Sequence, residues 1–228
     1  CLMAKGLFIT ASGTEIGKTL VACALAHQIG AKGEDVTVLK PVISGFDAND
    51  FETSDSALLL EAAGKQATLE TISAISPWRF DAPIAPNMAA LRAGKPIDLA
   101  AVIQFCNDQL SDKTTTVIEG VGGVMAPITD HKTVIDWMAG IDLSAIIVVG
   151  SYLGALSHGL TAIGALQRRN IAIAGIIISE SEDAPVALEE TKTCFENFVG
   201  EIPVRALPRL KTDLRNWESA PDFSDLLP

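Results

Sequence analysis

The feature that most restricts the fold is a glycine-rich stretch, ASGTEIGKT at residues 11–19, between an apolar run and a helical pattern. The apolar run GLFIT covers residues 6–10, and the helical pattern continues from Lys18 to about Ala31. Gly-Lys-Thr between a strand and a helix is typical of a phosphate-binding loop, because backbone N–H groups and the helix N-terminus attract phosphate. In the usual spacing of that loop the first glycine falls on position 12, which is Ser12 in this chain. The sequence therefore predicts a strand, a phosphate-binding loop with one departure, and a helix.

Further apolar runs repeat this alternation of strand and helix. They are continuous rather than alternating, which is typical of strands buried on both faces. We expect strands at 35–41, 114–120, 144–150, 171–179 and 204–207, and helices at about 54–64, 98–110, 133–140, 155–169 and 185–199. Such a pattern predicts an α/β fold with a mostly parallel central sheet flanked by helices on both faces. The proline-rich segment 76–87 is predicted to be a surface loop near the ligand.

Composition excludes several classes of partner. The formal charge is −11, from 17 Lys and Arg against 28 Asp and Glu. Large nucleic-acid or anionic-membrane surfaces favour clustered Lys and Arg, so we expect neither partner. The apolar runs are too short to span a bilayer, and the four cysteines form no C-x-x-C pair that would indicate zinc or a disulfide framework. We therefore expect a cytoplasmic protein.

We assign a single domain to residues 3–228. Cys1 and Leu2 precede Met3, which can serve as an initiator, so we expect these two residues to be additions to the natural chain.

Ligands of a parallel sheet bind at the carboxyl ends of its strands, so we compared the residues that follow each expected strand. Lys18 would balance the charge of a bound phosphate, and the Thr19 hydroxyl would reach Mg²⁺. Glu119 ends a buried strand, and Asp55 is a second carboxylate that could hold the metal. The sequence thus predicts an ATP and Mg²⁺ site. The alternatives are that Gly-Lys-Thr is an ordinary helix start, that Glu119 is a surface carboxylate at a strand end, and that Asp55 is a charge at a helix N-terminus.

Lys40 is the most informative residue, because an ATPase needs the lysine of the loop but not a second one after the neighbouring strand. Two cations at one point suit a substrate that becomes anionic beside the γ-phosphate, such as a carboxylate or a carbamate. The alternative is a solvated strand-end lysine before proline.

Several segments together resemble one enzyme family. They are TEIGKT at 14–19, LKPVISG at 39–45, SD at 54–55, VIEGVGGVMAPI at 117–128, DW at 136–137 and VVGSYLGALSH at 148–158. In this order the chain resembles the dethiobiotin synthetases, ATP-dependent enzymes of biotin synthesis with a P-loop NTPase-like fold. The resemblance implies that one amine of 7,8-diaminononanoate takes up CO₂ as a carbamate. The carbamate then attacks the γ-phosphate of Mg-ATP, and the second amine closes the ureido ring with loss of phosphate.

The resemblance also implies a role for individual residues. Lys18, Lys40 and Thr14 would be catalytic, and Thr19, Asp55 and Glu119 would hold Mg²⁺. The nucleotide would contact Glu15, Ile16, Gly17, Lys18, Thr19, Leu20, Asp55, Glu119, Gly120, Val121, Gly122, Ser179, Glu180, Pro208, Arg209 and Leu210. The substrate would contact Ser44, Lys40, Gly154, Ala155, Leu156 and Ser157, the last four across the interface of a homodimer. For Ser157 the alternative is a residue that only caps or packs the helix start.

The chain departs from the family pattern at several of these positions. Ala11 replaces a glycine and Ser12 a threonine of the loop, while Ser157 and Ser179 each stand where the family commonly has asparagine. A methyl group at position 11 would hinder a positive φ, so weaker ATP binding is expected if the loop requires one there.

Two rival interpretations remain at this point. Cobyrinate amidation enzymes have a similar loop but carry an additional glutaminase domain with a nucleophilic cysteine, for which 228 residues leave no room. An ATP-driven dimerising switch of the partitioning or division-site type would have a lysine where this chain has Gly13, and a basic amphipathic tail that this chain lacks. Turnover that requires a diamine and bicarbonate, rather than DNA or lipid, would separate these classes.

Overall fold

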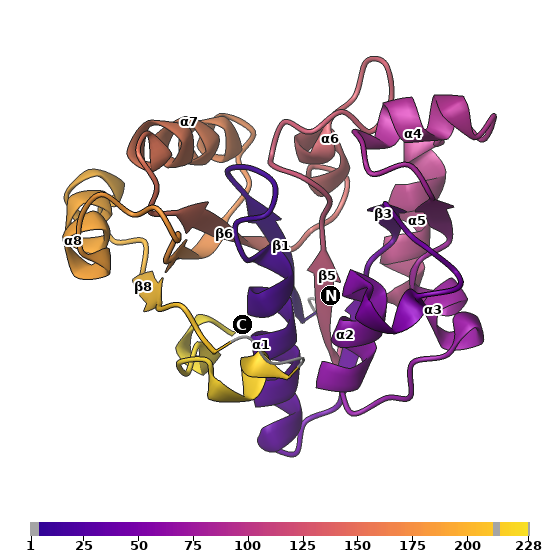
Figure 1. Cartoon of the computed structure of the whole chain (residues 1–228), viewed down its shortest axis with the longest axis horizontal. Helices are drawn as coiled ribbons and strands as arrows, with labels where there is room; N and C mark the ends of the chain where they lie inside the picture. The colour runs from indigo at the N-terminus through magenta and orange to yellow at the C-terminus, as the bar shows by residue number, and fades with distance from the viewer. Residues whose placement is uncertain (1–4, 212–214, 228) are drawn as a thin grey trace.

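The computed structural model of the protein describes residues 5–211 and 215–227, and its centre is a parallel sheet (Figure 1). Its strands are β1 (Gly6–Ala11), β2 (Val36–Leu39), β5 (Thr115–Glu119), β6 (Ser144–Gly150), β7 (Ile173–Ser179) and β8 (Val204–Leu207). They lie in the order β2-β5-β1-β6-β7-β8, and every neighbouring pair is parallel. The predicted α/β fold class is confirmed.

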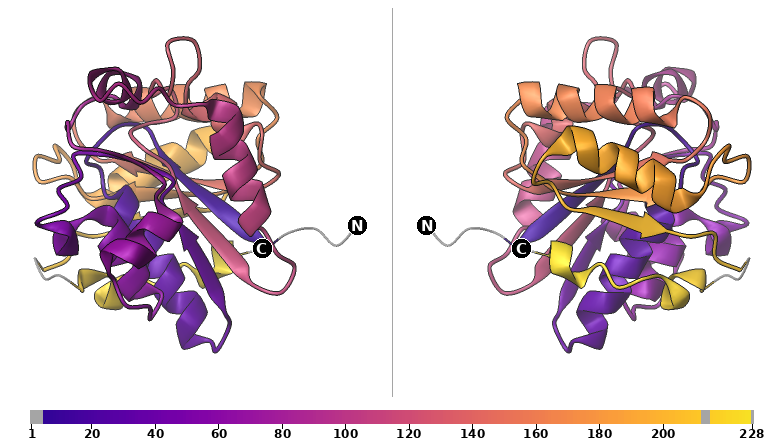
Figure 2. Two further views of the ribbon diagram at one scale, coloured as in Figure 1. Left: turned by 90° about the vertical axis from the view of Figure 1, so that its right-hand side faces the viewer. Right: turned by 90° about the vertical axis from the view of Figure 1, so that its left-hand side faces the viewer.

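Helices cover both faces of this sheet, as the side views show (Figure 2). The helices are α1 (Lys18–Ala31), α2 (Asp55–Ala62), α3 (Leu69–Ile75), α4 (Pro86–Arg92), α5 (Leu99–Gln109), α6 (Val134–Met138), α7 (Ala155–Arg168) and α8 (Leu188–Val199). Alternate side chains of β1 point to opposite faces, so Phe8 joins a core with α4 to α8, while Leu7 and Ile9 join a core with α1 to α3. The second core is completed by short 3-10 turns at Phe51–Thr53, Asn216–Ser219 and Ser224–Leu226.

The predicted loop at 76–87 is wrong in part. Strand β3 (Val42–Ser44) pairs in parallel with β4 (Trp78–Phe80), which lies inside that segment, and the two form a separate small sheet. Helix α4 then begins at Pro86, where proline is tolerated because the first N–H of a helix needs no intrahelical acceptor. Helix α3 was also not predicted, although Thr68 and Thr71 form a capping box at its start.

The loop after β1 does not need a positive φ at position 11. Ala11 is the last residue of the extended strand, fully buried, and the positive φ values of the loop fall on Glu15 (59°) and Gly17 (92°). The physical reason for expecting weaker ATP binding from Ala11 is therefore absent.

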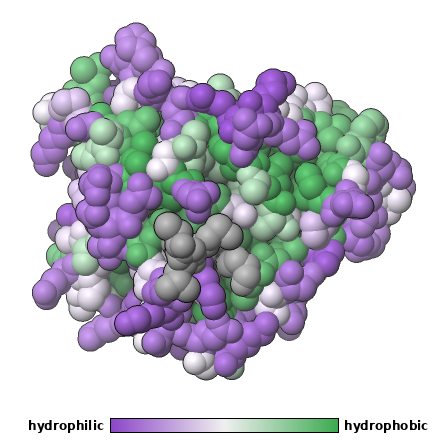
Figure 3. All heavy atoms as spheres, turned by 180° about the vertical axis from the view of Figure 1, so that it is seen from behind, coloured by the Kyte–Doolittle hydropathy of each residue, from purple (hydrophilic) through white to green (hydrophobic). Residues whose placement is uncertain are grey.

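The surface seen from behind has polar side chains around most of its edge and hydrophobic ones in a band between them (Figure 3). Among the described residues, no helix has the length and apolar character needed to cross a membrane. Several large hydrophobic side chains are nevertheless exposed, including Leu153 (86% exposed), Leu91 and Met125.

Candidate active site

Glu119 is the centre of a buried polar cluster at the carboxyl edge of the sheet. Its carboxylate is fully buried, and its Oε1 accepts hydrogen bonds from Lys40 Nζ at 2.6 Å and from Thr19 Oγ1 at 2.8 Å. Lys18 Nζ lies 3.5 Å from the same oxygen. Three donors from the first turn of α1 and from the residue after β2 therefore converge on one oxygen at the end of β5.

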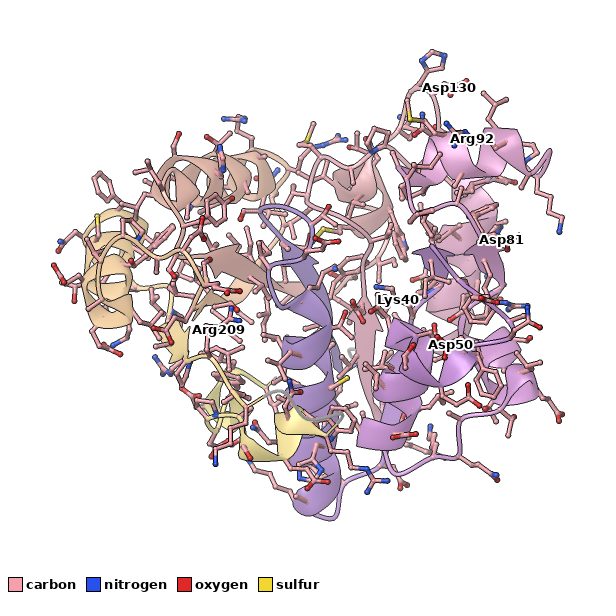
Figure 4. The ribbon with its side chains drawn as sticks, viewed as in Figure 1. Lys40, Asp50, Asp81, Arg92, Asp130 and Arg209 are labelled. Atoms are coloured by element: carbon pink, nitrogen blue, oxygen red, sulfur yellow. The ribbon has the colours of Figure 1, made fainter. Side chains whose placement is uncertain are left out.

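Lys40 is held by three acceptors, and Figure 4 shows it between α1, α2 and β5. Besides Glu119, its ammonium donates to the carbonyl oxygen of Gly120 at 3.0 Å and pairs with Asp55 Oδ2 at 2.9 Å. The residue is only 1% exposed, whereas the Asp55 side chain is 40% exposed. The alternative of a solvated strand-end lysine is therefore wrong.

The charges in this cluster shift one another's proton affinities. Burial acts to lower the pKa of Lys40, but the Glu119 and Asp55 carboxylates outweigh it, and the pKa is raised above its usual value. Burial acts to raise the pKa of Asp55, but Lys40 outweighs it and lowers that pKa to about 2. Both groups are thus charged at neutral pH.

Lys18 differs from Lys40 in its electrostatic balance. Burial and the neighbouring Lys40 ammonium lower the pKa of Lys18, and the opposing effect of Glu119 does not compensate for them. Lys18 is therefore the less well neutralised of the two cations. A phosphate group bound in the loop would supply the missing negative charge.

The phosphate-binding loop packs against the glycines after β5. A side chain at Gly123 would lie 3.1 Å from the backbone nitrogen of Gly13 and 3.2 Å from the carbonyl oxygen of Ala11. A side chain at Gly122, where φ is 59°, would approach Ala126 to 2.7 Å and Thr14 Oγ1 to 3.7 Å. Close approach of the two loops explains the glycine at position 123, and the positive φ explains the glycine at position 122.

A cavity of about 670 Å³ extends from the loop towards the ends of β7 and β8. Among its lining residues are these predicted nucleotide contacts: Glu15, Ile16, Gly17, Leu20, Ser179, Glu180, Pro208, Arg209 and Leu210. Thr14, which was predicted to be catalytic, also lines this cavity. Of the remaining predicted contacts, Lys18, Thr19, Asp55, Glu119 and Gly120 belong to the buried cluster. Val121 packs partly buried against the core, and Gly122 lies in the turn against Ala126 and Thr14. Cluster and cavity meet at the start of α1, because Gly17 lines the cavity and Lys18 and Thr19 follow it.

Oxygen atoms suited to Mg²⁺ are present in the cluster. Glu119 Oε2 is buried and has no hydrogen-bond partner among the described residues. The Asp55 carboxylate pairs with Lys40, and the Thr19 hydroxyl donates to the other oxygen of Glu119. In residues 5–211 and 215–227, no group of three or more His, Cys, Asp or Glu could hold a metal ion. Magnesium does not require one, since it binds through one or two carboxylates plus substrate phosphates and water. The predicted ligand set Thr19, Asp55 and Glu119 therefore fits Mg²⁺.

The predicted substrate residues are not all brought together. Ser44 ends β3, and its hydroxyl is buried without a hydrogen-bond partner among the described residues. Gly154, with a φ of 96°, precedes α7, whose first residues are Ala155, Leu156 and Ser157. Within the described part of the chain, no hydrogen bond or ion pair joins this helix start to Lys40. Among the described residues, no side-chain hydrogen bond caps the start of α7, so the capping half of the alternative for Ser157 finds no support.

Sequence reasoning missed several cavity residues. Ser181, Glu182 and Asp183 lie within four residues of the end of β7, so the rule that ligands bind after strands could have found them. Tyr152 similarly follows β6. Asn216 comes from the C-terminal segment, for which the sequence showed no periodic pattern and no motif.

Comparisons with known proteins show the family of this chain. The profile of a family described as an AAA domain matches residues 5–210. The ATP-dependent dethiobiotin synthetase BioD of Caulobacter vibrioides is 41% identical over 98% of this chain and 99% of its own length. The protein of the same name from Methylobacterium nodulans is 41% identical over 85% of this chain and 89% of its own. The chain belongs to the ATP-dependent dethiobiotin synthetase family.

Solved structures show that this dethiobiotin synthetase family member shares its fold with proteins of low sequence identity. The ParA family ATPase of Chlorobium tepidum matches 95% of this chain and 90% of its own with a TM-score of 0.55. The MinC:MinD cell division complex of Aquifex aeolicus matches 95% of this chain with a TM-score of 0.56. Their identities of 17% and 12% support the P-loop NTPase-like fold alone. The alternative of a partitioning or division-site switch is not favoured.

Proposed function

We propose that this protein forms dethiobiotin from 7,8-diaminononanoate, CO₂ and Mg-ATP. One amine nitrogen bonds to the carbon of CO₂ and loses a proton, which gives a carbamate. A carbamate oxygen then attacks the γ-phosphorus and ADP leaves. The second amine attacks the carbamate carbon and loses a proton, the C–O bond to phosphate breaks, phosphate leaves, and the ureido ring is closed.

The observation that carries this proposal is the buried position of Lys40 next to Lys18. Both ammonium groups lie within 3.5 Å of Glu119 Oε1, so two positive charges face the point where the loop would place the γ-phosphate. A carbamate and a transferring phosphoryl group add negative charge at that point, and fixed cations in a buried site stabilise such charge strongly. Lys40 uses all three of its N–H donors in the present contacts, so it would exchange one of them for the carbamate. Asp55, the most exposed of its partners, is the one to be exchanged.

The other residues would mainly position the reactants. Backbone N–H groups from Thr14 to Thr19 would hold the phosphates, and the unpartnered Ser44 hydroxyl would contact the diamine. When bound at Thr19, Asp55 and Glu119, Mg²⁺ would supply Lewis-acid polarisation of the phosphate oxygens.

The proposed reaction is tested by ADP release with 7,8-diaminononanoate and bicarbonate, each omitted in turn. Omission of either substrate is expected to abolish ADP release, and dethiobiotin should form in equal amount to ADP. ADP release that continues without the diamine, or that depends on DNA or lipid, would contradict the proposal.

Removal of divalent ions tests the metal site. Chelation is expected to abolish turnover, because the phosphoryl charge then lacks its main neutralising ion. It should leave the protein folded, since Lys18 and Lys40 together already balance the charges of Asp55 and Glu119 in the described structure. Circular dichroism with the chelator present is the control, and turnover that survives complete removal of divalent ions would contradict the assigned ligands.

The tail carboxylate of the diamine needs an anchor separate from the phosphate pocket, and we place it at the start of α7 in a homodimer. The N–H groups of Leu156 and Ser157 have no hydrogen-bond acceptor within the described residues, and no side chain caps this helix. Such free N–H groups bind anions. Leu153 and Leu156 are exposed beside them, which is apolar surface that a second subunit would cover. The carboxylate would thus lie on Gly154 to Ser157 of the partner subunit.

Leu156→Pro removes one of these N–H groups at a helix position where proline is tolerated. Loss of one hydrogen bond to a charged group is expected to raise the diamine KM by about tenfold or more and to leave the ATP KM nearly unchanged. Leu156→Ala is the matched control, because it removes the side chain but keeps the N–H. An unchanged diamine KM in a folded dimeric Leu156→Pro variant, or full activity in a stable monomer, would contradict the shared site.

A further inference from the structure

A second cavity, of about 540 Å³, lies beside the small sheet of β3 and β4. Its lining comes from β4, from α3, from the segment after β3 and from the loop between α4 and α5. None of its lining residues belongs to the cluster around Glu119 or to the cavity beside the phosphate-binding loop. Figure 4 shows Asp81, which lines this second cavity, well apart from Lys40. A cavity of this volume is large enough for a small organic molecule.

Arg79 is a half-buried cation in the wall of this second cavity. Its Nη1 donates to the carbonyl oxygen of Ser76, and its Cζ lies 5.6 Å from the centre of the Phe46 ring. These two contacts hold the guanidinium in place. A guanidinium carries several N–H donors in a fixed plane, and no carboxylate among the described residues pairs with this one. Arg79 therefore retains donors for a ligand.

Lys95 adds a second cation to the same lining. Like Arg79, it forms no ion pair within residues 5–211 and 215–227. Acidic residues are plentiful in this chain, which has a formal charge of −11, yet neither cation has an acidic partner. Asp81 is the other charged residue of the lining, and it is exposed to solvent. Two cations against one carboxylate leave the cavity with a net positive charge.

The rest of the wall is largely apolar. Apolar residues of the lining include Phe46, Leu69, Pro77, Trp78 and Pro96. Phe46 is only 6% exposed, and the Trp78 ring packs edge-on against Phe105 with 5.8 Å between the ring centres. These aromatic side chains are therefore held by the core, and the apolar part of the wall is formed before any ligand binds.

We propose that the second cavity binds an organic carboxylate with an apolar body, held by Arg79 and Lys95. A guanidinium matches a carboxylate because parallel N–H groups meet its two oxygens. The ammonium of Lys95 adds a second positive charge, and the apolar wall covers the body of the ligand. This site goes beyond the proposed function and does not depend on it.

Calorimetric titration with hexanoate tests the site, and acetate is the matched ligand with the same carboxylate but a single methyl group. Hexanoate is expected to bind at a saturable site, and acetate should bind at least about tenfold more weakly because it buries less apolar surface. Arg79→Gln should raise the hexanoate Kd by about tenfold or more, the scale of losing a hydrogen bond to a charged group. Lys95 is exposed, so Lys95→Gln should raise this Kd by only about threefold. Absence of saturable hexanoate binding, or equal Kd values for acetate and hexanoate, would overturn the proposal.

Two control variants show where hexanoate binds. Arg92→Gln removes the same charge from an exposed arginine of α4 that does not line the cavity, so the Kd should stay within about twofold of the wild-type value. Leu156→Pro alters the anchor proposed at α7 and should also leave this Kd unchanged. An equal rise in Arg92→Gln and Arg79→Gln, or loss of binding in Leu156→Pro, would overturn the assigned site. Circular dichroism checks the fold of Arg79→Gln. If that variant does not fold, an unchanged Kd in Lys95→Gln overturns the proposal instead.

Discussion

Replacing Lys40 with methionine or alanine is expected to lower turnover by about 100-fold or more, the scale of losing one preorganised electrostatic contact. Binding of ATP should remain nearly intact. The reason is geometric: Lys40 follows β2 and contacts Asp55, Glu119 and the Gly120 carbonyl, whereas the loop that would bind the phosphates follows β1. Lys40→Met keeps the buried alkyl chain, so it separates loss of charge from loss of packing.

Lys18→Ala is the counterpart that should weaken nucleotide binding and turnover together. Lys18 opens α1 directly after the loop, and its charge is the less neutralised of the two. Calorimetric Kd values for Mg-ADP and kcat measured with diamine and bicarbonate distinguish the two variants. Equal loss of nucleotide binding in both variants would contradict this division of roles.

The second large effect is expected from Glu119→Gln. This change removes a fully buried carboxylate that Lys18, Lys40 and Thr19 share, and it leaves buried lysines without their main partner. Removing one partner of a buried ion pair costs about 3–5 kcal/mol, so the free energy of unfolding of the nucleotide-free protein should fall by that amount. Urea denaturation measures this loss, and turnover should be lost as well.

The pH dependence of this loss has a definite sign. Without the carboxylate, the pKa of Lys18, already lowered by burial in the wild-type protein, should fall further. A lysine whose folded pKa lies below its unfolded value binds fewer protons in the folded state, so stability rises with pH in that interval. The deficit of Glu119→Gln should therefore shrink as the pH rises towards the unfolded pKa of lysine.

Asp55→Asn is the control for Glu119→Gln. It removes a carboxylate that also pairs with Lys40, but one whose side chain is 40% exposed, so solvent already screens the pair. Its cost should be no more than about 1 kcal/mol by the same measurement. If the Glu119→Gln variant were as stable as Asp55→Asn, burial would not determine how much each carboxylate contributes to the free energy of unfolding.

Much of the fold could be predicted because its strands are buried on both faces. The run SAIIVVG at 144–150 coincides with β6, and Gly17-Lys18-Thr19 marks the start of α1. What the sequence did not reveal are elements too short to show a period. Strands β3 and β4 have three residues each, and the prolines around β4 are typical of loops. Tertiary packing of Val42 and Phe80 into the core decides their structure instead.

The site was predictable where residues follow strands and less so elsewhere. The rule that ligands bind after strands predicted that Lys40 and Glu119 lie at the same site, and in the structure Lys40 Nζ lies 2.6 Å from Glu119 Oε1. The pairing of Glu180 with the Arg209 backbone joins residues 29 positions apart, and no local pattern indicates it. Whether the predicted site residues perform their assigned roles stays a prediction that the variants above test.

The single oxygen Glu119 Oε1 receives Lys18, Thr19 and Lys40 at once. Contacts that share one acceptor cannot be treated as independent pairs, so double variants among these residues should lose less than the sum of the single losses. A bound phosphate that attracts Lys18 would change its contact with Glu119 Oε1. Because Lys40 contacts the same oxygen, its electrostatic environment would change as well. By reciprocity, the factor by which bound ADP changes the affinity for the proposed diamine substrate must equal the factor by which that substrate changes the affinity for ADP.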